Sequence, residues 1–215
     1  MGKKKITGTK NVYELAQERL KVILTSLIIS MYLFRLARTA GTVEHVYRLY
    51  RKNNLKIRLG VFHMDYEIQY KMTIDYVDRI LEANKDILDV YRVCVPFRVS
   101  TCTSMYQSFW RPWKTVRRIY GALHAQEGND QGRLPFYNTT MWDYEFQMRF
   151  AQWIHNKNDA VRTCCLIGIR TQESFNRWRC IYMSRKFQMY HKYKWTSKVG
   201  NDIYNATHLL RTETG

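Results

Sequence analysis

Proline and glycine are scarce in this sequence, and no apolar stretch is long. The 215 residues include 3 prolines and 10 glycines, which excludes a collagen-like or low-complexity chain. The longest apolar run extends from Val22 to Phe34 and is interrupted by Thr25 and Ser26, whereas a membrane-spanning helix needs about 20 apolar residues. We therefore predict that this run is buried in a globular domain and not inserted in a membrane.

Cysteines are odd in number, and no two of them form a C-x-x-C pair. The chain has five: Cys94, Cys102, Cys164, Cys165 and Cys180. An odd number without the pattern of a leader peptide favours the reducing cytoplasm over a secreted disulfide scaffold. Structural zinc and iron–sulfur sites usually contain close cysteine pairs. We therefore expect buried structural thiols, with neither a metal site nor an iron–sulfur cluster.

Acidic residues are outnumbered by basic ones, and the formal net charge is +17 at pH 7. Such a surplus attracts polyanions of any kind, nucleic acid included. Residues 177–198 contain seven Lys or Arg residues interleaved with aromatic ones and no acid, a composition that suits phosphate backbones and stacked bases. The same composition also fits a solvated basic surface whose aromatic side chains face the core, and the sequence leaves both interpretations open.

The periodicity of apolar residues predicts alternating strands and helices. Helical spacing occurs over 11–22, 66–84 and 143–155, and β-type patterns occur over 56–65, 87–95 and 164–169. Residues 121–134, which are rich in glycine, predict a loop. Alternation of this kind indicates the α/β class, with a mostly parallel sheet and helices on both faces.

Polar residues follow two of the predicted strands. His63 and Asp65 come at the end of one strand and, being two positions apart, are expected on one face of it. Such a pair suits phosphate or metal chemistry and equally suits a structural role, and the sequence leaves both open. Arg170 follows the apolar strand at 164–169, and Glu173 comes three residues later. Arginine is the natural bidentate partner of phosphate or sulfate, and open α/β folds bind ligands where their strands end. We therefore predict an oxyanion site at this edge.

Two stretches resemble a known family. Residues 61–70, VFHMDYEIQY, and 166–177, LIGIRTQESFNR, look like the phosphoadenosine phosphosulfate (PAPS) reductase-like family of the PP-loop adenine nucleotide hydrolase superfamily, and above all its PAPS reductase/sulfotransferase branch. The resemblance covers residues 8–22, 46–113 and 134–205. It implies a single, incomplete PP-loop-type domain over 1–215, with the family pattern lost at about 23–42, 114–133 and 207–215. The chain thus looks truncated and locally frameshifted.

The resemblance also implies a ligand and its site. In an intact member Asp65 would lie near the nucleotide, while Arg170, Glu173 and Arg177 would surround its phosphate or sulfate. The ligand would be an adenine nucleotide, ATP or PAPS, with which Mg²⁺ is compatible, and the reaction a nucleotidyl or sulfur transfer in sulfur metabolism. A partner protein resembling ParB or sulfiredoxin is also implied. Reduction of PAPS is disfavoured, because the family's reductases use a cysteine near the carboxyl terminus and Cys180 is the last thiol here. No catalytic residue is assigned.

The defining phosphate-binding loop of that family is missing. A strand followed by S-G-G-K-D-S is expected before Tyr47, but residues 31–41 read MYLFRLARTAG. Allowed codons for these eleven residues, read from the third base, spell V-S-F-S-A-G-K-D-S-G, which suggests a local frameshift. Without a fixed set of phosphate donors we expect impaired nucleotide binding. The alternative function is that of a non-enzymatic, basic nucleic-acid-binding protein.

Overall fold

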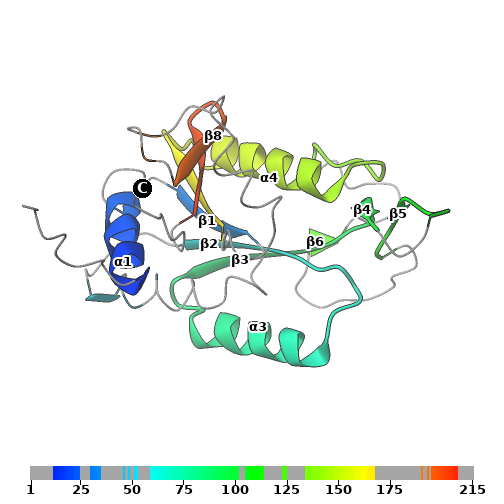
Figure 1. Ribbon diagram of the computed structural model, residues 1–215, viewed down its shortest axis with the longest axis horizontal. Helices are drawn as coiled ribbons and strands as arrows, with labels where there is room; N and C mark the ends of the chain where they lie inside the picture. Colours follow the sequence, from blue (N-terminus) through cyan, green and yellow to red (C-terminus); the bar gives the residue numbers. More distant parts are fainter. Residues whose placement is uncertain are drawn as a thin grey trace, which may run out of the picture.

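The computed structural model describes a large part of the chain in twelve named elements. The described residues are 12–24, 30–34, 46, 48, 51–52, 59–101, 105–113, 123–124, 134–167, 190, 193 and 195–207. The helices are α1 (Val12–Val22), α3 (Lys71–Ala83) and α4 (Asp143–Lys157). The strands are β1 (Ser30–Phe34), β2 (Leu59–Met64), β3 (Leu88–Cys94), β4 (Val99–Ser100), β5 (Phe109–Trp110), β6 (Leu123–His124), β7 (Thr163–Ile167), β8 (Thr196–Gly200) and β9 (Ile203–Ala206). Figure 1 shows α3 and α4 on opposite sides of the main sheet.

Strand β1 lies in the middle of a seven-stranded sheet of order β6-β3-β2-β1-β7-β9-β8. It pairs in parallel with β2 on one side and β7 on the other, so that Tyr32 lies between Gly60 and Cys165. The pairs β2–β3, β3–β6 and β7–β9 are parallel too, whereas β8 runs antiparallel to β9. The chain proceeds outward from β1 through β2 to β3 and later continues on the other side at β7, so the order reverses at β1.

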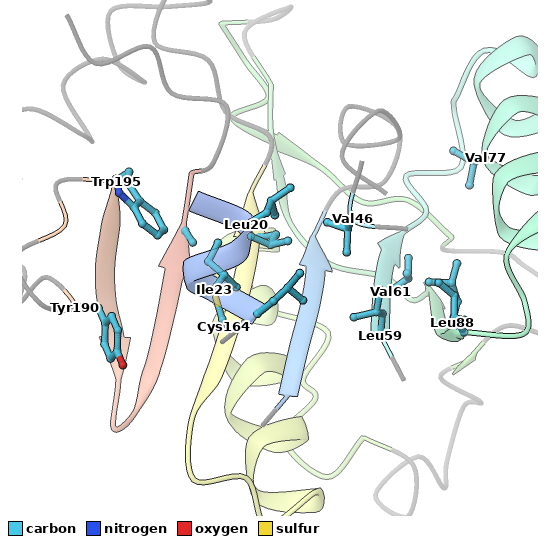
Figure 2. Close-up of a cluster of buried hydrophobic side chains, with 14 residues drawn as sticks. Leu20, Ile23, Val46, Leu59, Val61, Val77, Leu88, Cys164, Tyr190 and Trp195 are labelled. Atoms are coloured by element: carbon cyan, nitrogen blue, oxygen red, sulfur yellow. The ribbon is translucent and has the colours of Figure 1, made fainter. Parts of the chain in front are cut away.

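The sheet separates two clusters of buried side chains. On one face Leu59 and Val61 of β2 pack with residues of α1 and with Val77 of α3, and Figure 2 shows this cluster. On the other face Phe62 and Met64 of the same strand pack with α4. Every residue of β2 is buried, as expected for a strand covered on both faces. Its alternating side chains therefore serve two cores.

Aromatic rings dominate the cluster beneath α4. The rings of Phe62 and Phe150 stack with their centroids 4.1 Å apart. Tyr91 of β3 meets Phe150 edge to face at 5.6 Å, and Phe146 is fully buried beside them. Buried aromatic pairs of this kind each contribute about 0.5–1.5 kcal/mol beyond the area that they bury. This layer fixes α4 over the centre of the sheet.

The α/β class predicted from the sequence is confirmed, and so are most of its elements. Helices α1 and α4 and strands β2, β3 and β7 lie where the periodicity places them. The predicted helix over 66–84 is wrong at its start, because α3 begins at Lys71. Residue Glu67 has a φ of 64°, which a helix cannot contain. Within the predicted loop at 121–134 the structure has the short strand β6.

Candidate functional site

The carboxyl ends of four strands meet at one edge of the sheet. The register places Phe34 of β1 opposite Phe62 and opposite Ile167, the last residue of β7. Met64 of β2 lies opposite Val93 of β3. Asp65 follows Met64, and its backbone N–H donates to the carbonyl of Val93 at 2.9 Å. Asp65 thus lies at this carboxyl edge, one strand away from the end of β1.

Asp65 is almost completely buried and held by three donors. Its exposed fraction is 4%. Oδ1 accepts hydrogen bonds from the backbone N–H of Glu67 at 2.9 Å and from Nε2 of Gln69 at 3.3 Å. Oδ2 accepts from Nη2 of Arg92 at 3.2 Å. Charge-assisted bonds from several directions fix a carboxylate in one orientation, and the bond from Glu67, two residues further on, closes an Asx turn directly after β2.

Arg92 links Asp65 to α3. Its other terminal nitrogen, Nη1, donates to Oδ1 of Asp78 at 3.0 Å. The Asp65 side chain is 5% exposed, while that of Asp78 is 51% exposed. A buried carboxylate paired with a guanidinium is strongly destabilised when that partner is removed. Arg92 therefore binds the buried Asp65 with one terminal nitrogen and the exposed Asp78 of α3 with the other.

His63 belongs to the same cluster and lies two residues before Asp65, on the same face of the strand. It is 3% exposed, and its Nδ1 is buried without a hydrogen-bond partner among the described residues. Burial, assisted by the Arg92 charge, lowers the pKa of His63 from 6.5 to about 4, although Asp65 and Asp78 act in the opposite direction. His63 is therefore a neutral imidazole at neutral pH. This cluster of His63, Asp65, Asp78 and Arg92 is called the carboxyl-edge cluster.

A distant segment closes over the turn that follows β2. The indole Nε1 of Trp113 donates to the backbone carbonyl of Asp65 at 2.7 Å, and the backbone N–H of Trp113 donates to Oε2 of Glu67 at 2.8 Å. From the other side, the Tyr66 hydroxyl donates to Oδ2 of Asp143, the first residue of α4, at 3.1 Å. The turn is thus fixed on both sides.

The carboxyl-edge cluster presents one oriented hydrogen-bond acceptor, the carboxylate of Asp65. Asp65 keeps capacity on Oδ2 for a donor from a ligand, since only Arg92 binds that oxygen among the described residues. The neutral His63, on the same face of the strand, has a buried ring nitrogen without a partner among the described residues. In the described part of the chain, no three His, Cys, Asp or Glu side chains are grouped so that they could hold a metal ion. The arrangement suits recognition of a hydroxyl or amino group.

Only one of the four predicted site residues falls in the described structure. The prediction that His63 and Asp65 come together at a strand end agrees with the carboxyl-edge cluster. Arg170, Glu173 and Arg177 lie outside the described residues. The sequence prediction missed Arg92, Gln69 and Trp113 as partners of Asp65. Arg92 carried one signal, a lone cation inside an otherwise β-type segment, but its partner became apparent only from the register of β2 and β3.

A cavity of about 260 Å³ lies between α4 and the strands β7 to β9. Its polar lining includes Gln147, Gln152 and Asn205, and its apolar lining includes Met148, Ile167 and Ile203. Two residues of its lining, Ala151 and Ile203, belong to the cluster beneath α4, whereas Leu59 and Val61, on the same face of β2 as His63, belong to the cluster on the other side of the sheet. The cavity is therefore separate from Asp65.

The three cysteines in the described structure are buried, as predicted. Cys164 and Cys165 are consecutive residues of β7 and lie in different core clusters, one on each face of the sheet. Burial raises the pKa of Cys164 to about 12. It does the same for Cys94, where the Asp65 charge adds to the effect. These thiols are core residues that stay protonated at neutral pH.

The basic aromatic segment at 177–198 is described only at its end. There Tyr190 and Trp195 are both buried, with exposed fractions of 8% each, and both belong to the cluster beneath α1. Their rings face the core, as the more conservative of the two sequence interpretations expects. Tyr193, between them, is 38% exposed, and residues 177–189, 191, 192 and 194 lie outside the described residues.

Comparisons with known proteins identify one distant relative and no family. No protein-family model matches the chain. The chain is 29% identical, over 195 residues, to the uncharacterized protein YbdN of Escherichia coli strain K12. The match covers 90% of this chain but 47% of YbdN, so the chain spans about half the length of this relative. Among the helices of the described residues, none combines the length and apolar character needed to cross a bilayer.

Proposed function

We propose that this chain is a PP-loop-type protein of the PAPS reductase-like family that handles an adenylyl-sulfate or ATP-type nucleotide. Its reaction class would be nucleotidyl or sulfur transfer. The observation that carries the proposal is Asp65, a buried and fully oriented carboxylate at the carboxyl edge of the sheet, next to the strand at which the strand order reverses.

The strand order supports a ligand site at this position. In open α/β sheets, ligands bind outside the carboxyl ends of the strands where the order of the strands reverses. Here that point lies between β1 and β7, which pair directly. The segment after β1 and the segment with Arg170 after β7 both continue from this edge of the sheet in the sequence. A nucleotide whose phosphates lay there would be one strand away from Asp65, which follows β2.

The sequence after β1 differs from the phosphate-binding loop of the family. Residues 35–40 read RLARTA and follow directly on Phe34, where the family carries S-G-G-K-D-S. A glycine-rich loop binds phosphates through its backbone N–H groups, and its lysine and serines add further donors. The sequence here has two arginines, which supply charge, but lacks the glycines, lysine and serines of that loop. We therefore expect the present chain to bind ATP and PAPS weakly.

Loop replacement tests the proposal. Residues 35–40 are exchanged for Ser-Gly-Gly-Lys-Asp-Ser, and thermal unfolding is followed with increasing ATP or PAPS at constant ionic strength. The restored chain should be stabilised saturably, by about 2.7 kcal/mol at a hundredfold excess over Kd. The matched control carries Ala-Gly-Gly-Ala-Asp-Ala over the same residues. Equal stabilisation of the two loops by nucleotide would refute the proposal.

A substitution of Asp65 extends the loop-replacement experiment. In the restored chain Asp65→Asn retains the size of the side chain but removes its charge, and the affinity for nucleotide should fall by about tenfold, as expected for the loss of one charge-assisted hydrogen bond. Asp75→Asn is the control, because Asp75 is exposed on α3 and pairs only with Lys71 among the described residues.

The alternative function, a non-enzymatic nucleic-acid-binding protein, is supported by the net charge of +17. Such binding depends steeply on salt, because it releases counterions from the phosphate backbone. An affinity for single-stranded oligonucleotides that falls at least tenfold between 50 and about 200 mM salt, with no response to ATP or PAPS in either loop variant, would favour this function.

A further inference from the structure

Two arginines face each other on the short ribbon of β4 and β5. The register pairs Val99 with Trp110 and Ser100 with Phe109, so Arg98 and Arg111 occupy the next opposed positions. Both guanidinium groups lie against one ring: the Cζ atoms of Arg98 and Arg111 are 5.0 and 5.5 Å from the centroid of Phe109. The two cations therefore share a single aromatic neighbour.

Nothing in the described part of the chain neutralises this pair. No carboxylate there forms an ion pair with Arg98 or Arg111, and the Nε–H of each is buried without a hydrogen-bond partner. Like charges directly opposite each other on two strands destabilise a sheet, and a buried donor without an acceptor costs about 1–3 kcal/mol. One anion bound to the terminal N–H groups of both guanidinium groups would offset both charges.

The pair is held in place by the backbone around it. The N–H of Arg98 donates to the carbonyl of Met141 at 2.7 Å, and its own carbonyl accepts from the N–H of Asp143 at 3.0 Å. The Phe109 ring meets Trp142 edge to face at 6.0 Å. Arg98 is thus fixed to the start of α4, and Phe109 is fixed from the same side. Cations positioned by a rigid support are suited to binding, because little freedom is lost when a ligand arrives.

We propose that Arg98 and Arg111 form a binding site for a tetrahedral dianion, either inorganic phosphate or sulfate or the phosphate group of a nucleotide. A guanidinium presents parallel N–H groups that match two oxygens of such an ion, and two of them match its double charge. The ribbon follows β3 and lies beyond the strand ends at the side of the sheet where β2 and β3 finish (Figure 1). The site is distinct from Asp65 and does not rest on the proposed nucleotide function.

The test measures anion binding by the full chain and its variants. Stabilisation by phosphate and by sulfate is followed at constant ionic strength, with chloride as the replaced ion. The unaltered chain should be stabilised saturably, and Arg98→Gln or Arg111→Gln should weaken the affinity at least tenfold. Arg79→Gln, which removes an exposed arginine of α3, is the control for net charge and should bind as the unaltered chain does.

A second measurement separates binding from a structural role. In chloride alone, Arg98→Gln and Arg111→Gln should unfold at the same denaturant concentration as the unaltered chain or at a higher one, since each removes repulsion. Arg98→Lys retains charge but lacks the fork, and should also lose at least tenfold in affinity. Unchanged phosphate affinity in both glutamine variants, or equal loss of stability with and without phosphate, would overturn the proposal.

Further ligands identify the source of the anion. Adenosine 5′-monophosphate that binds more tightly than inorganic phosphate, in an Arg98-dependent way, would assign the site to a nucleotide, whereas equal affinities would assign it to the free ion. Binding of a single-stranded oligonucleotide with no response to either small ligand would contradict the site. This proposal fails if phosphate affinity is unchanged in the Arg98 and Arg111 variants, whereas the nucleotide proposal fails if nucleotide stabilises the two loop variants equally, so the two failures can be told apart.

Discussion

At the scale of single residues, His63 shows how burial converts a titratable side chain into a pH-sensitive element. The ring is 3% exposed, and burial together with Arg92 lowers its pKa to about 4. In the unfolded chain the same ring takes up a proton near its usual value of about 6.5. Between these two values the unfolded state binds more protons than the folded state, so stability is full above pH 6.5 and decreases as the pH falls towards 4.

His63→Gln should remove this acid sensitivity. Each unit of pKa difference corresponds to about 1.4 kcal/mol, so His63 should account for a loss of about 2 kcal/mol between pH 7 and 4.5. Urea unfolding at the two pH values measures it: the stability of the unaltered chain relative to His63→Gln should decrease by that amount on acidification. Between pH 7.5 and 8.5 the difference should stay constant, which is the internal control. A difference that does not change down to pH 4.5 would contradict the buried, neutral state of His63.

At the scale of helices and strands, the sequence predicts those features that depend on the local spacing of apolar residues. Strand β2 and the polar residue at its end were predicted because an alternating apolar run stops at Asp65. Its partners Arg92 and Trp113 were not predicted, since they come from segments 27 and 48 residues away. Arg92 meets Asp65 through the parallel register of β2 and β3, and Trp113 through the course of the chain after β5. The hairpin β8–β9 was missed as well, because Ser197, Lys198 and Asn205 give it no regular apolar alternation.

The apolar pattern predicted that β1 is buried but not that it is a strand; a strand before Tyr47 was expected from the family resemblance alone. Its apolar residues form one continuous run with those before it, and a run of this kind does not distinguish a buried strand from a buried helix. What decides its conformation is the pair of parallel partners on its two sides. The central strand therefore depends on long-range pairing more than on its own residues.

A proline in β1 should be far more harmful than a proline in β8. Leu33 pairs with both Val61 and Leu166, so Leu33→Pro removes a donor from the centre of the sheet, and we expect a loss of about 3 kcal/mol or more, or failure to fold. Val199 has no partner in the β8–β9 register, which shifts between Lys198 and Gly200. Val199→Pro should therefore change the free energy of unfolding by less than about 1 kcal/mol, because prolines are tolerated at bulges. Equal losses in thermal or urea unfolding would show that β1 is not the central strand.

At the scale of the whole molecule, one sheet separates two cores that share strands but not side chains. The cluster under α1 and α3 contains Ile23, and the cluster under α4 contains Ile154; both residues are fully buried. Cys164 and Cys165 repeat the same division within a single strand. If the two layers depend on a common sheet, loss of either one should unfold the whole domain, although the side chains of the two layers do not touch.

Matched conservative substitutions test this arrangement. Ile23→Val and Ile154→Val each delete one buried methylene-sized group, and each should cost about 0.5–1.5 kcal/mol. Because the sheet lies between them, the double variant should lose the sum of the two single losses to within about 0.5 kcal/mol. All three should keep a single urea transition with the slope of the unaltered chain, since the slope reports the surface exposed on unfolding. Two separate transitions would mean that the layers fold as independent units, whereas one transition with a coupling above about 1 kcal/mol would mean that the two clusters interact through a rearranged sheet.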